Sequence, residues 1–254
     1  GELSLEGECR GVGGVLPMVI VARENGIKRI VTARSNVNEA LLVDDIRVYG
    51  VNTLSELIAF LNNENALSPA QRQEVRADSI SSADDFSDVQ GQFVAKRAFE
   101  IAAAGGHNLL MSGSPGAGKT MLARRMGSIL PDMTREEALE VTKIYSIAGL
   151  LPDNGGLMTV RPFRSPHHTI STAAMIGGGA IPKPGEVSLS HNGVLFLDEL
   201  PEFSRSALES LRQPLEDNEV VVARVNGTLK LPARIMLVSG RNPCPCSLAP
   251  SPEC

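Results

Sequence analysis

The sequence lacks the marks of a membrane or secreted protein. No apolar run approaches the roughly 18 residues needed to cross a membrane, and no segment resembles a signal peptide. The four cysteines among 254 residues fit a reducing compartment better than a disulfide scaffold. These absences predict a cytoplasmic protein that makes no membrane contact.

The sequence also lacks an excess of positive charge. Its formal net charge is −5, from 24 Lys and Arg against 29 Asp and Glu. That balance excludes a generally basic protein that coats nucleic acid, so any DNA contact must be made by local basic loops. With 43% hydrophobic residues, the chain has material for one large and one partial domain, each able to bury a core.

One segment carries a complete nucleotide-binding motif. Residues 113–120, GSPGAGKT, match the phosphate-loop pattern G-x-x-x-x-G-K-[ST], between a predicted buried strand at 108–112 and a predicted helix at 121–126. The glycines let backbone N–H groups surround phosphates, Lys119 supplies a mobile positive charge, and the Thr120 hydroxyl can hold Mg²⁺. The alternative interpretation, in which residues 113–120 are only a Gly-rich turn before a helix, is weaker. The predicted nucleotide-binding residues are Gly113, Ser114, Pro115, Gly116, Ala117, Gly118, Lys119, Thr120 and Met121.

A second segment supplies acidic residues at the end of a predicted strand. Residues 194–197, VLFL, are typical of a fully buried parallel strand, and they run directly into Asp198 and Glu199. We expect Asp198 to be a partner of Mg²⁺ and Glu199 to polarise the attacking water. Alone, such a run is an ordinary strand boundary. Together with the phosphate loop, it predicts the catalytic carboxylate pair.

A third predicted strand, at 234–239, is followed by Asn242 and Pro243. An amide both donates and accepts hydrogen bonds, so Asn242 is suited to orienting water against the γ-phosphate. The alternative, in which Asn242 and Pro243 only begin a turn, is equally compatible with these residues alone.

Several segments together resemble the ComM/YifB family, the magnesium-chelatase-like AAA+ ATPases of bacteria. They are DFSDVQGQ at 85–92, AGGHNLL at 104–110, the phosphate loop, RPFRSPHHT at 161–169, the stretch 192–203, and NPCPC at 242–246. The resemblance implies a ring-forming, hexameric motor that uses ATP and Mg²⁺ and drives branch migration of DNA during transformation. It also implies that the turn at 89–92, with Val89 and Gly91, lies against the adenine. The chain departs from the family at 239–241, where Ser-Gly-Arg replaces Ala-Ala-Met, and at Ser247, which replaces a Gly.

These observations predict an α/β fold in two parts. Residues 85–254 form a P-loop AAA+ core around a parallel sheet, residues 64–84 form a linker, and residues 1–63 resemble the second half of a Lon-protease-like domain of the ribosomal-S5 type. Leu16 and Met18 stand where that resemblance places a catalytic lysine, so we expect a structural or ring-organising role and no peptidase activity. The resemblance implies that the AAA+ lid and arginine finger lie outside these residues, and the chain is expected to be part of a longer polypeptide.

Two loops are candidates for DNA contact. Residues 177–185 are expected to be an irregular insert bearing Lys183, and residues 220–231 are expected to form a hairpin around Asn226 and Gly227. Arg224 and Lys230 flank the hairpin tip and can meet phosphates. The alternative is that each of these basic side chains is an ordinary solvated charge on a loop.

For several other residues, both a functional role and an ordinary structural role fit the sequence. Cys244, Cys246 and Cys254 can supply three thiolates to Zn²⁺, although free cysteines in a Pro-rich loop fit slightly better. His167 and His168 point to opposite faces of an extended segment, which favours a structural role over metal binding. Arg164 and Arg212 are weaker candidates for contacts between subunits.

The sequence therefore favours an ATP-hydrolysing AAA+ ring motor that acts on DNA as a helicase or branch-migration enzyme in DNA uptake or recombination. The alternative is a chelatase-type or protein-remodelling ATPase with a protein or metal-insertion partner. The Cys-Pro-Cys after Asn242 favours the ComM type. A non-catalytic nucleotide-binding module is disfavoured by the intact Lys119, Asp198 and Glu199.

Overall fold

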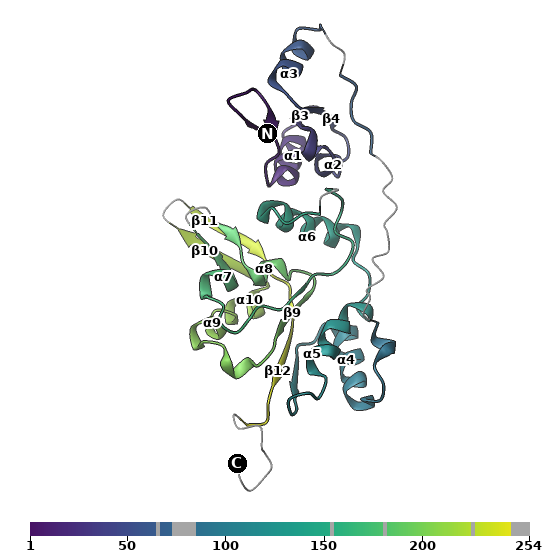
Figure 1. The fold of residues 1–254 in the computed structure, drawn as a ribbon, viewed down its shortest axis with the longest axis vertical. Coiled ribbons are helices and arrows are strands. Elements are labelled where there is room, and N and C mark those ends of the chain that lie inside the picture. Colours follow the sequence, from purple (N-terminus) through teal and green to yellow (C-terminus); the bar gives the residue numbers. More distant parts are fainter. Residues whose placement is uncertain (65–66, 73–84, 153–154, 180–181, 225–226, 245–254) are drawn as a thin grey trace. The chain divides into compact units, whose positions relative to one another are not determined.

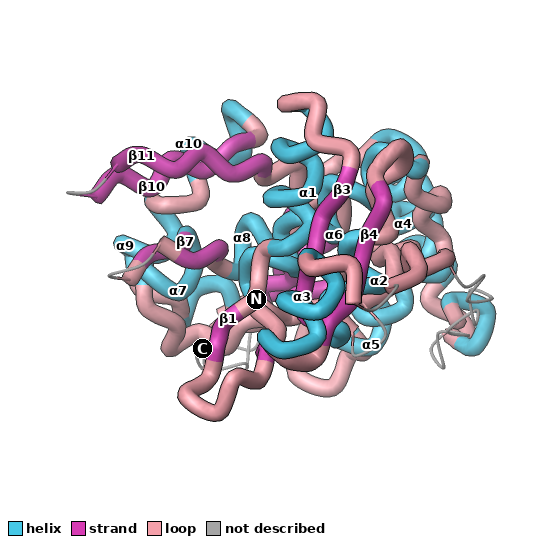
Figure 2. Tube along the Cα trace, turned by 90° about the horizontal axis from the view of Figure 1, so that it is seen from above, coloured by secondary structure: helices cyan, strands magenta, loops and turns pink. Residues whose placement is uncertain are grey.

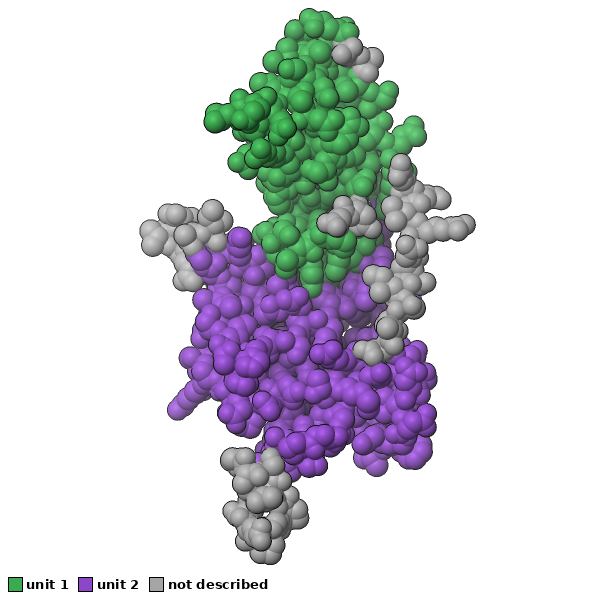
Figure 3. Space-filling view, viewed as in Figure 1, with its two compact units in different colours: residues 1–77, 138–158 green, residues 78–137, 159–254 purple. Residues whose placement is uncertain are grey.

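The computed structural model describes residues 1–64, 67–72, 85–152, 155–179, 182–224 and 227–244. The chain divides into two compact units (Figure 3). Unit 1 comprises Gly1–Ala77 and Ala138–Met158, and unit 2 comprises Asp78–Glu137 and Thr159–Cys254. Among the described helices, none has the length and apolar character that crossing a membrane requires.

Unit 1 is a small α/β unit around a parallel strand pair, β3 (Arg29–Ala33) and β4 (Arg47–Val51) (Figure 2). Its other elements are β1 (Glu2–Leu3) and β2 (Cys9–Arg10), which pair antiparallel, and the helices α1 (Val15–Glu24), η1 (Arg34–Asn36), α2 (Val37–Ala40) and α3 (Leu54–Leu61). Leu16 is fully buried in the core of this unit, whereas Met18 is 59% exposed. The first of the two positions that departs from the Lon pattern thus holds a packing residue.

A buried carboxylate joins residues of unit 1 that are distant in sequence. Glu39 accepts hydrogen bonds from the Leu16 backbone N–H at 2.8 Å, from the Asn36 amide at 3.2 Å and from the Ser146 hydroxyl. Ser146 lies on α6 (Arg135–Ala148). Leu139 and Leu157 pack against the same core, so residues 138–158 fold with the N-terminal residues.

Unit 2 is built on a four-stranded parallel sheet in the order β5-β12-β9-β6. The strands are β5 (Leu109–Ser112), β12 (Met236–Arg241), β9 (Val194–Leu197) and β6 (Phe163–Arg164). Every residue of β9 is buried, as its continuous apolar sequence predicts. Phe196 packs with α4 (Phe93–Gly105) and α5 (Lys119–Arg124), whereas Leu195 and Leu197 pack with α7 (Thr172–Ile176) and α8 (Glu186–Leu189), because successive side chains of a strand point to opposite faces. These two pairs of helices lie on opposite sides of β9 (Figure 1).

Short helices and two hairpins complete unit 2. The helices are η2 (Phe86–Asp88), α4 (Phe93–Gly105), α5 (Lys119–Arg124), η3 (Arg125–Ser128), α7 (Thr172–Ile176), α8 (Glu186–Leu189), η4 (Leu200–Glu202), α9 (Arg205–Glu209) and α10 (Arg212–Asp217). Strands β10 (Glu219–Arg224) and β11 (Gly227–Pro232) pair antiparallel, as the sequence predicts. The prediction that 177–185 is wholly irregular is wrong: β7 (Gly177–Gly178) pairs with β8 (Lys183–Pro184), because Gly177 adopts a φ of 116° and lies against the backbone of that partner strand.

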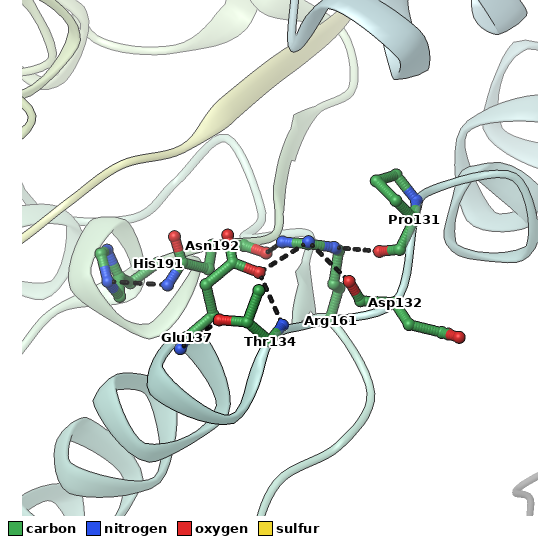
Figure 4. A network of polar contacts seen from close by, with 7 residues as sticks. All are labelled: Pro131, Asp132, Thr134, Glu137, Arg161, His191 and Asn192. Carbon is green, nitrogen blue, oxygen red and sulfur yellow. Dashed lines mark hydrogen bonds and ion pairs between the residues drawn. The ribbon is translucent and has the colours of Figure 1, made fainter.

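A polar network fixes the entry to the central strands (Figure 4). The Arg161 guanidinium donates to the carbonyl oxygens of Pro131 at 2.6 Å and Asn192 at 2.7 Å, and it pairs with Glu137 at 2.9 Å. His191 accepts a hydrogen bond from the Arg234 backbone N–H at 3.0 Å. Since these residues precede β6, β9 and β12, the network holds the strands that carry polar residues at their opposite ends.

Candidate nucleotide-binding site

The phosphate loop connects β5 to α5, and a backbone hydrogen bond within the loop closes a tight turn. Gly116 and Gly118 have φ values of 77° and 84°, which only glycine adopts without strain. The Ala117 N–H donates to the Ser114 carbonyl at 3.2 Å, and the Gly113 N–H donates to the Arg241 carbonyl of β12 at 3.2 Å. The first N–H groups of a helix have no partner within the helix, so the start of α5 offers donors to an anion.

Lys119 lies at the centre of this loop. Its ammonium donates to the carbonyl oxygens of Gly113 at 2.6 Å and Ser114 at 3.0 Å, and to Asn242 Oδ1 at 3.1 Å. The predicted sensor amide and the predicted phosphate-binding lysine are thus in contact, although 123 positions separate them in the sequence.

Oxygen ligands for a divalent cation lie beside the loop. The Thr120 hydroxyl donates to Asp198 Oδ2 at 2.6 Å, and Asp198 Oδ1 accepts from the Glu199 backbone N–H at 3.0 Å. A hydroxyl and a carboxylate are the hard ligands that Mg²⁺ prefers, so this pair fits the ion. A Cβ added at Gly240 would lie 3.0 Å from Asp198 Oδ1, which shows how tightly β12 approaches the carboxylate.

A pocket of about 410 Å³ unites these groups. It is lined by Pro115, Gly116, Ala117, Gly118, Lys119, Thr120, Met121, Asp198, Glu199, Arg241 and Asn242. The sequence assigned a site role to each of these residues except Arg241. Arg241 could have been identified from the sequence, because it lies at the end of the central strand directly before Asn242.

The turn predicted to meet adenine reaches the loop through Gln92, whose amide lies 3.4 Å from the Ala117 carbonyl. Val89 packs in the core at 3% exposure, and Gly91 has a φ of 66°. Hydrogen bonds from Ser87 lower the pKa of the Asp85 carboxyl, which caps the helix before this turn. The adenine contacts of Val89 and Gly91 stay predictions.

His168 lies beside Glu199, the carboxylate predicted to polarise water, a position that sequence reasoning missed. Its Nδ1 is 3.6 Å from Glu199 Oε2, within the range of an ion pair for a protonated imidazole. His168 follows β6, which pairs with β9, and the carboxyl ends of paired parallel strands lie at one edge of the sheet. The pairing of β6 with β9 is therefore the feature that could have identified His168.

The basic residues predicted to contact DNA or another subunit differ in their exposure and in their ion pairs. Lys183 is exposed on β8, but Lys230 pairs with Glu219 at 3.0 Å. Of Arg224 only the backbone is described. Arg164 forms a bidentate ion pair with Glu186 at 2.7 and 2.8 Å, and Arg212 forms an ion pair with Glu216 at 3.2 Å.

The predicted zinc ligands are only partly covered by the structure. Cys244 is half-buried, whereas Cys246 and Cys254 lie outside the described residues. The described residues hold no group of three His, Cys, Asp or Glu side chains that is arranged for a metal ion. Zinc binding therefore gains no support here.

Comparison with known proteins relates the whole chain to a set of bacterial proteins. The family model for magnesium chelatase, subunit ChlI, matches residues 85–254. The chain is 46% identical to competence protein ComM of Haemophilus influenzae over 248 residues, covering 96% of this chain and 48% of that protein. It is also 46% identical to YifB of Escherichia coli over 247 residues, with the same coverage, and 49% identical over 255 residues to a protein of Mycobacterium tuberculosis, covering 50% of it.

A solved structure of the BchI and BchD subunits of magnesium chelatase matches at a TM-score of 0.47 and 22% identity, over 62% of this chain and 53% of that one. The chain spans about half the length of the curated relatives it matches.

Proposed function

This chain belongs to the magnesium chelatase subunit ChlI family, and on that premise we propose that it forms the nucleotide-hydrolysing core of an AAA+ ATPase of the ComM/YifB type. One observation carries the proposal. A single pocket is lined by Lys119, Thr120, Asp198, Glu199 and Asn242, which follow the ends of three neighbouring strands, β5, β9 and β12. A pocket of this composition is suited to holding phosphates and one divalent cation beside a carboxylate base.

The residues of the chain divide the work of hydrolysis. The loop N–H groups and Lys119 bind and orient the phosphates, and Thr120 with Asp198 would hold Mg²⁺, which when bound neutralises phosphate charge. Glu199 accepts a proton from the water that attacks, and its place in the same pocket as Lys119 gives it access to that water. Asn242, already hydrogen-bonded to Lys119, is placed to orient the water or the γ-phosphate.

We further propose that the full-length protein is a cytoplasmic hexameric ring that moves branched or single-stranded DNA. The support is the 46% identity to a protein named for competence, together with exposed Lys183 on the short β7–β8 pair of a chain with a net negative charge. The second candidate is a chelatase-type or protein-remodelling ATPase. Its support is the family model, whose description names a magnesium chelatase subunit.

One experiment separates these functions. The full-length protein is assayed for ATP hydrolysis with and without Mg²⁺, alone and with forked or four-way DNA. The DNA motor predicts Mg²⁺-dependent hydrolysis that DNA stimulates. Hydrolysis that DNA leaves unchanged would favour the remodelling function, and absence of Mg²⁺-dependent hydrolysis would contradict both.

A further inference from the structure

Glu199 has an unusual backbone and few partners. Its φ and ψ are 53° and 48°, in the left-handed region that non-glycine residues rarely occupy, and its side chain is 56% exposed. Within the described part of the chain, the polar contact of its carboxylate is the one to His168 Nδ1 at 3.6 Å. A general base with a mobile carboxylate loses rate, because small misplacements of a reacting group are costly.

His168 is itself held in place by its neighbours. Its ring lies 4.0 Å from the ring of His167, measured between centroids, and meets the ring of Phe203 edge-on at 6.4 Å. The expectation that the two histidines point to opposite faces of an extended segment is therefore wrong, because both follow β6 and His168 lies in a turn. His167 is fixed in turn by a 2.9 Å contact between its Nδ1 and the Thr169 hydroxyl. The imidazole that faces Glu199 therefore has a supporting shell of its own.

We propose that His168 is a positioning residue for Glu199, a role that rests on the proposed ATPase function. The contact is longer than a hydrogen bond, and catalytic contacts of this kind tighten when substrate is bound. Nδ1 then donates to Oε2 and directs the carboxylate toward the attacking water. His168 does not line the nucleotide pocket, so it acts on the rate of hydrolysis and leaves ATP affinity unchanged.

The test uses the full-length protein and steady-state ATPase kinetics. We expect His168→Ala to lower kcat by about 10- to 100-fold with KM and the Kd for ATP unchanged. His168→Asn keeps a donor and should recover part of the rate. His167→Ala removes the neighbouring ring but not the group that faces Glu199, so it should lower kcat by less than His168→Ala does. His107→Ala is the matched control, because it removes an exposed histidine of unit 2 that does not line the pocket, and it should stay within about threefold of the unmodified protein.

A double-mutant cycle gives a second readout. In a Glu199→Gln background, His168→Ala should cause no further loss, since the carboxylate that it positions is gone. Equal losses in His167→Ala and His168→Ala, or an unchanged kcat in His168→Ala, would refute the role. An unmodified protein without Mg²⁺-dependent hydrolysis would instead refute the proposed function on which the role depends.

A separate feature lies in unit 1, where three basic residues surround an open cleft of about 510 Å³. Arg29 and Arg47 begin the parallel strands β3 and β4 and are direct partners in the register, and Lys28 precedes Arg29. All three are exposed, and within the described part of the chain none forms an ion pair or a side-chain hydrogen bond. Asp45 and Ile46 complete the lining.

Lys28, Arg29 and Arg47 outnumber the one carboxylate of the lining, Asp45, so the cleft carries a net positive charge that favours an anion. Guanidinium groups bind phosphate oxygens in pairs, and a lysine adds a point charge. We infer that this cleft, defined by Lys28, Arg29 and Arg47, binds the phosphodiester backbone of DNA. Its openness suits a chain that crosses the cleft better than an enclosed small anion, and the inference rests on the proposed action on DNA.

The test measures binding of fluorescent forked DNA by the full-length protein over a range of salt concentrations. Substituting Lys28, Arg29 and Arg47 with Ala should weaken binding about tenfold or more and reduce the salt slope by about 2 to 3, since each phosphate contact contributes about 0.9. The control variant removes three exposed arginines that already have carboxylate partners: Arg10, Arg97 and Arg205. It changes the net charge equally and should leave the slope almost unchanged.

The outcomes separate the sources of an effect. Equal losses in the two triple variants would show a response to net charge alone and refute the site. Displacement of DNA by inorganic phosphate at submillimolar concentration would identify a small-anion site and also refute the inference. If the unmodified protein does not bind DNA, the proposed DNA function fails; if it binds and the cleft variant binds equally, only the cleft inference fails.

Discussion

Replacing Lys119 with Ala removes an ammonium that lies within 2.6 to 3.1 Å of three oxygen atoms around the phosphate loop. An ammonium held in that position is directed at the β- and γ-phosphates of a bound nucleotide. A charge-assisted hydrogen bond contributes about 1.5 to 3 kcal/mol. Because about 1.4 kcal/mol corresponds to tenfold in affinity, Lys119→Ala should raise the Kd for ATP about 10- to 150-fold.

Isothermal titration of Mg²⁺-ATP into the purified chain measures this change. Lys96→Ala is the control, because it removes the same charge from a residue of unit 2 that does not line the pocket. A thermal melt checks that both variants remain folded. A Kd for Lys119→Ala within twofold of the unmodified chain would refute the assignment of the loop, and equal losses in both variants would show an effect of net charge.

Three further outcomes are expected. Glu199→Gln in the full-length protein should retain ATP binding but lose hydrolysis about a hundredfold or more, and fast turnover would exclude Glu199 as the base. Alanine at Lys183, Arg224 and Lys230 should lower DNA affinity and flatten its salt dependence while ATP binding persists; an unchanged salt slope would contradict hairpin contact. Glu39→Ala leaves three donors in unit 1 without their acceptor and should lower the free energy of unfolding by about 3 kcal/mol in chemical denaturation, whereas Glu39→Gln should cost less.

The gathering of the candidate nucleotide-binding residues in one pocket was predictable because most of them belong to local sequence patterns. Eight consecutive residues set the geometry of the phosphate loop, and the apolar run before Asp198 specifies a buried strand whose end carries the acids. The contact between Lys119 and Asn242 needed one more fact, namely that β12 lies beside β5. The residues alone left that strand order open.

Other features depend on contacts that leave no local pattern. Residues 138–158 fold with the N-terminal unit through Leu139, Leu157 and Ser146, whose sequence reads as an ordinary amphipathic helix and loop. The contact of His168 with Glu199 follows from pairing between β9 and β6, and β6 has only two residues. A strand this short has too few side chains to show a periodicity that predicts its neighbours.

The position of β12 has a consequence for how the protein is made. Among the strands of this sheet in the described part of the chain, β12 comes last in sequence, yet it lies between β5 and β9, which begin 85 positions apart. During synthesis, β5 and β9 therefore emerge with unpaired edges facing an empty place, and those edges invite association with other chains. The pocket cannot close until residues 236–241 have left the ribosome, so a bound nucleotide could stabilise unit 2 only after β12 is inserted.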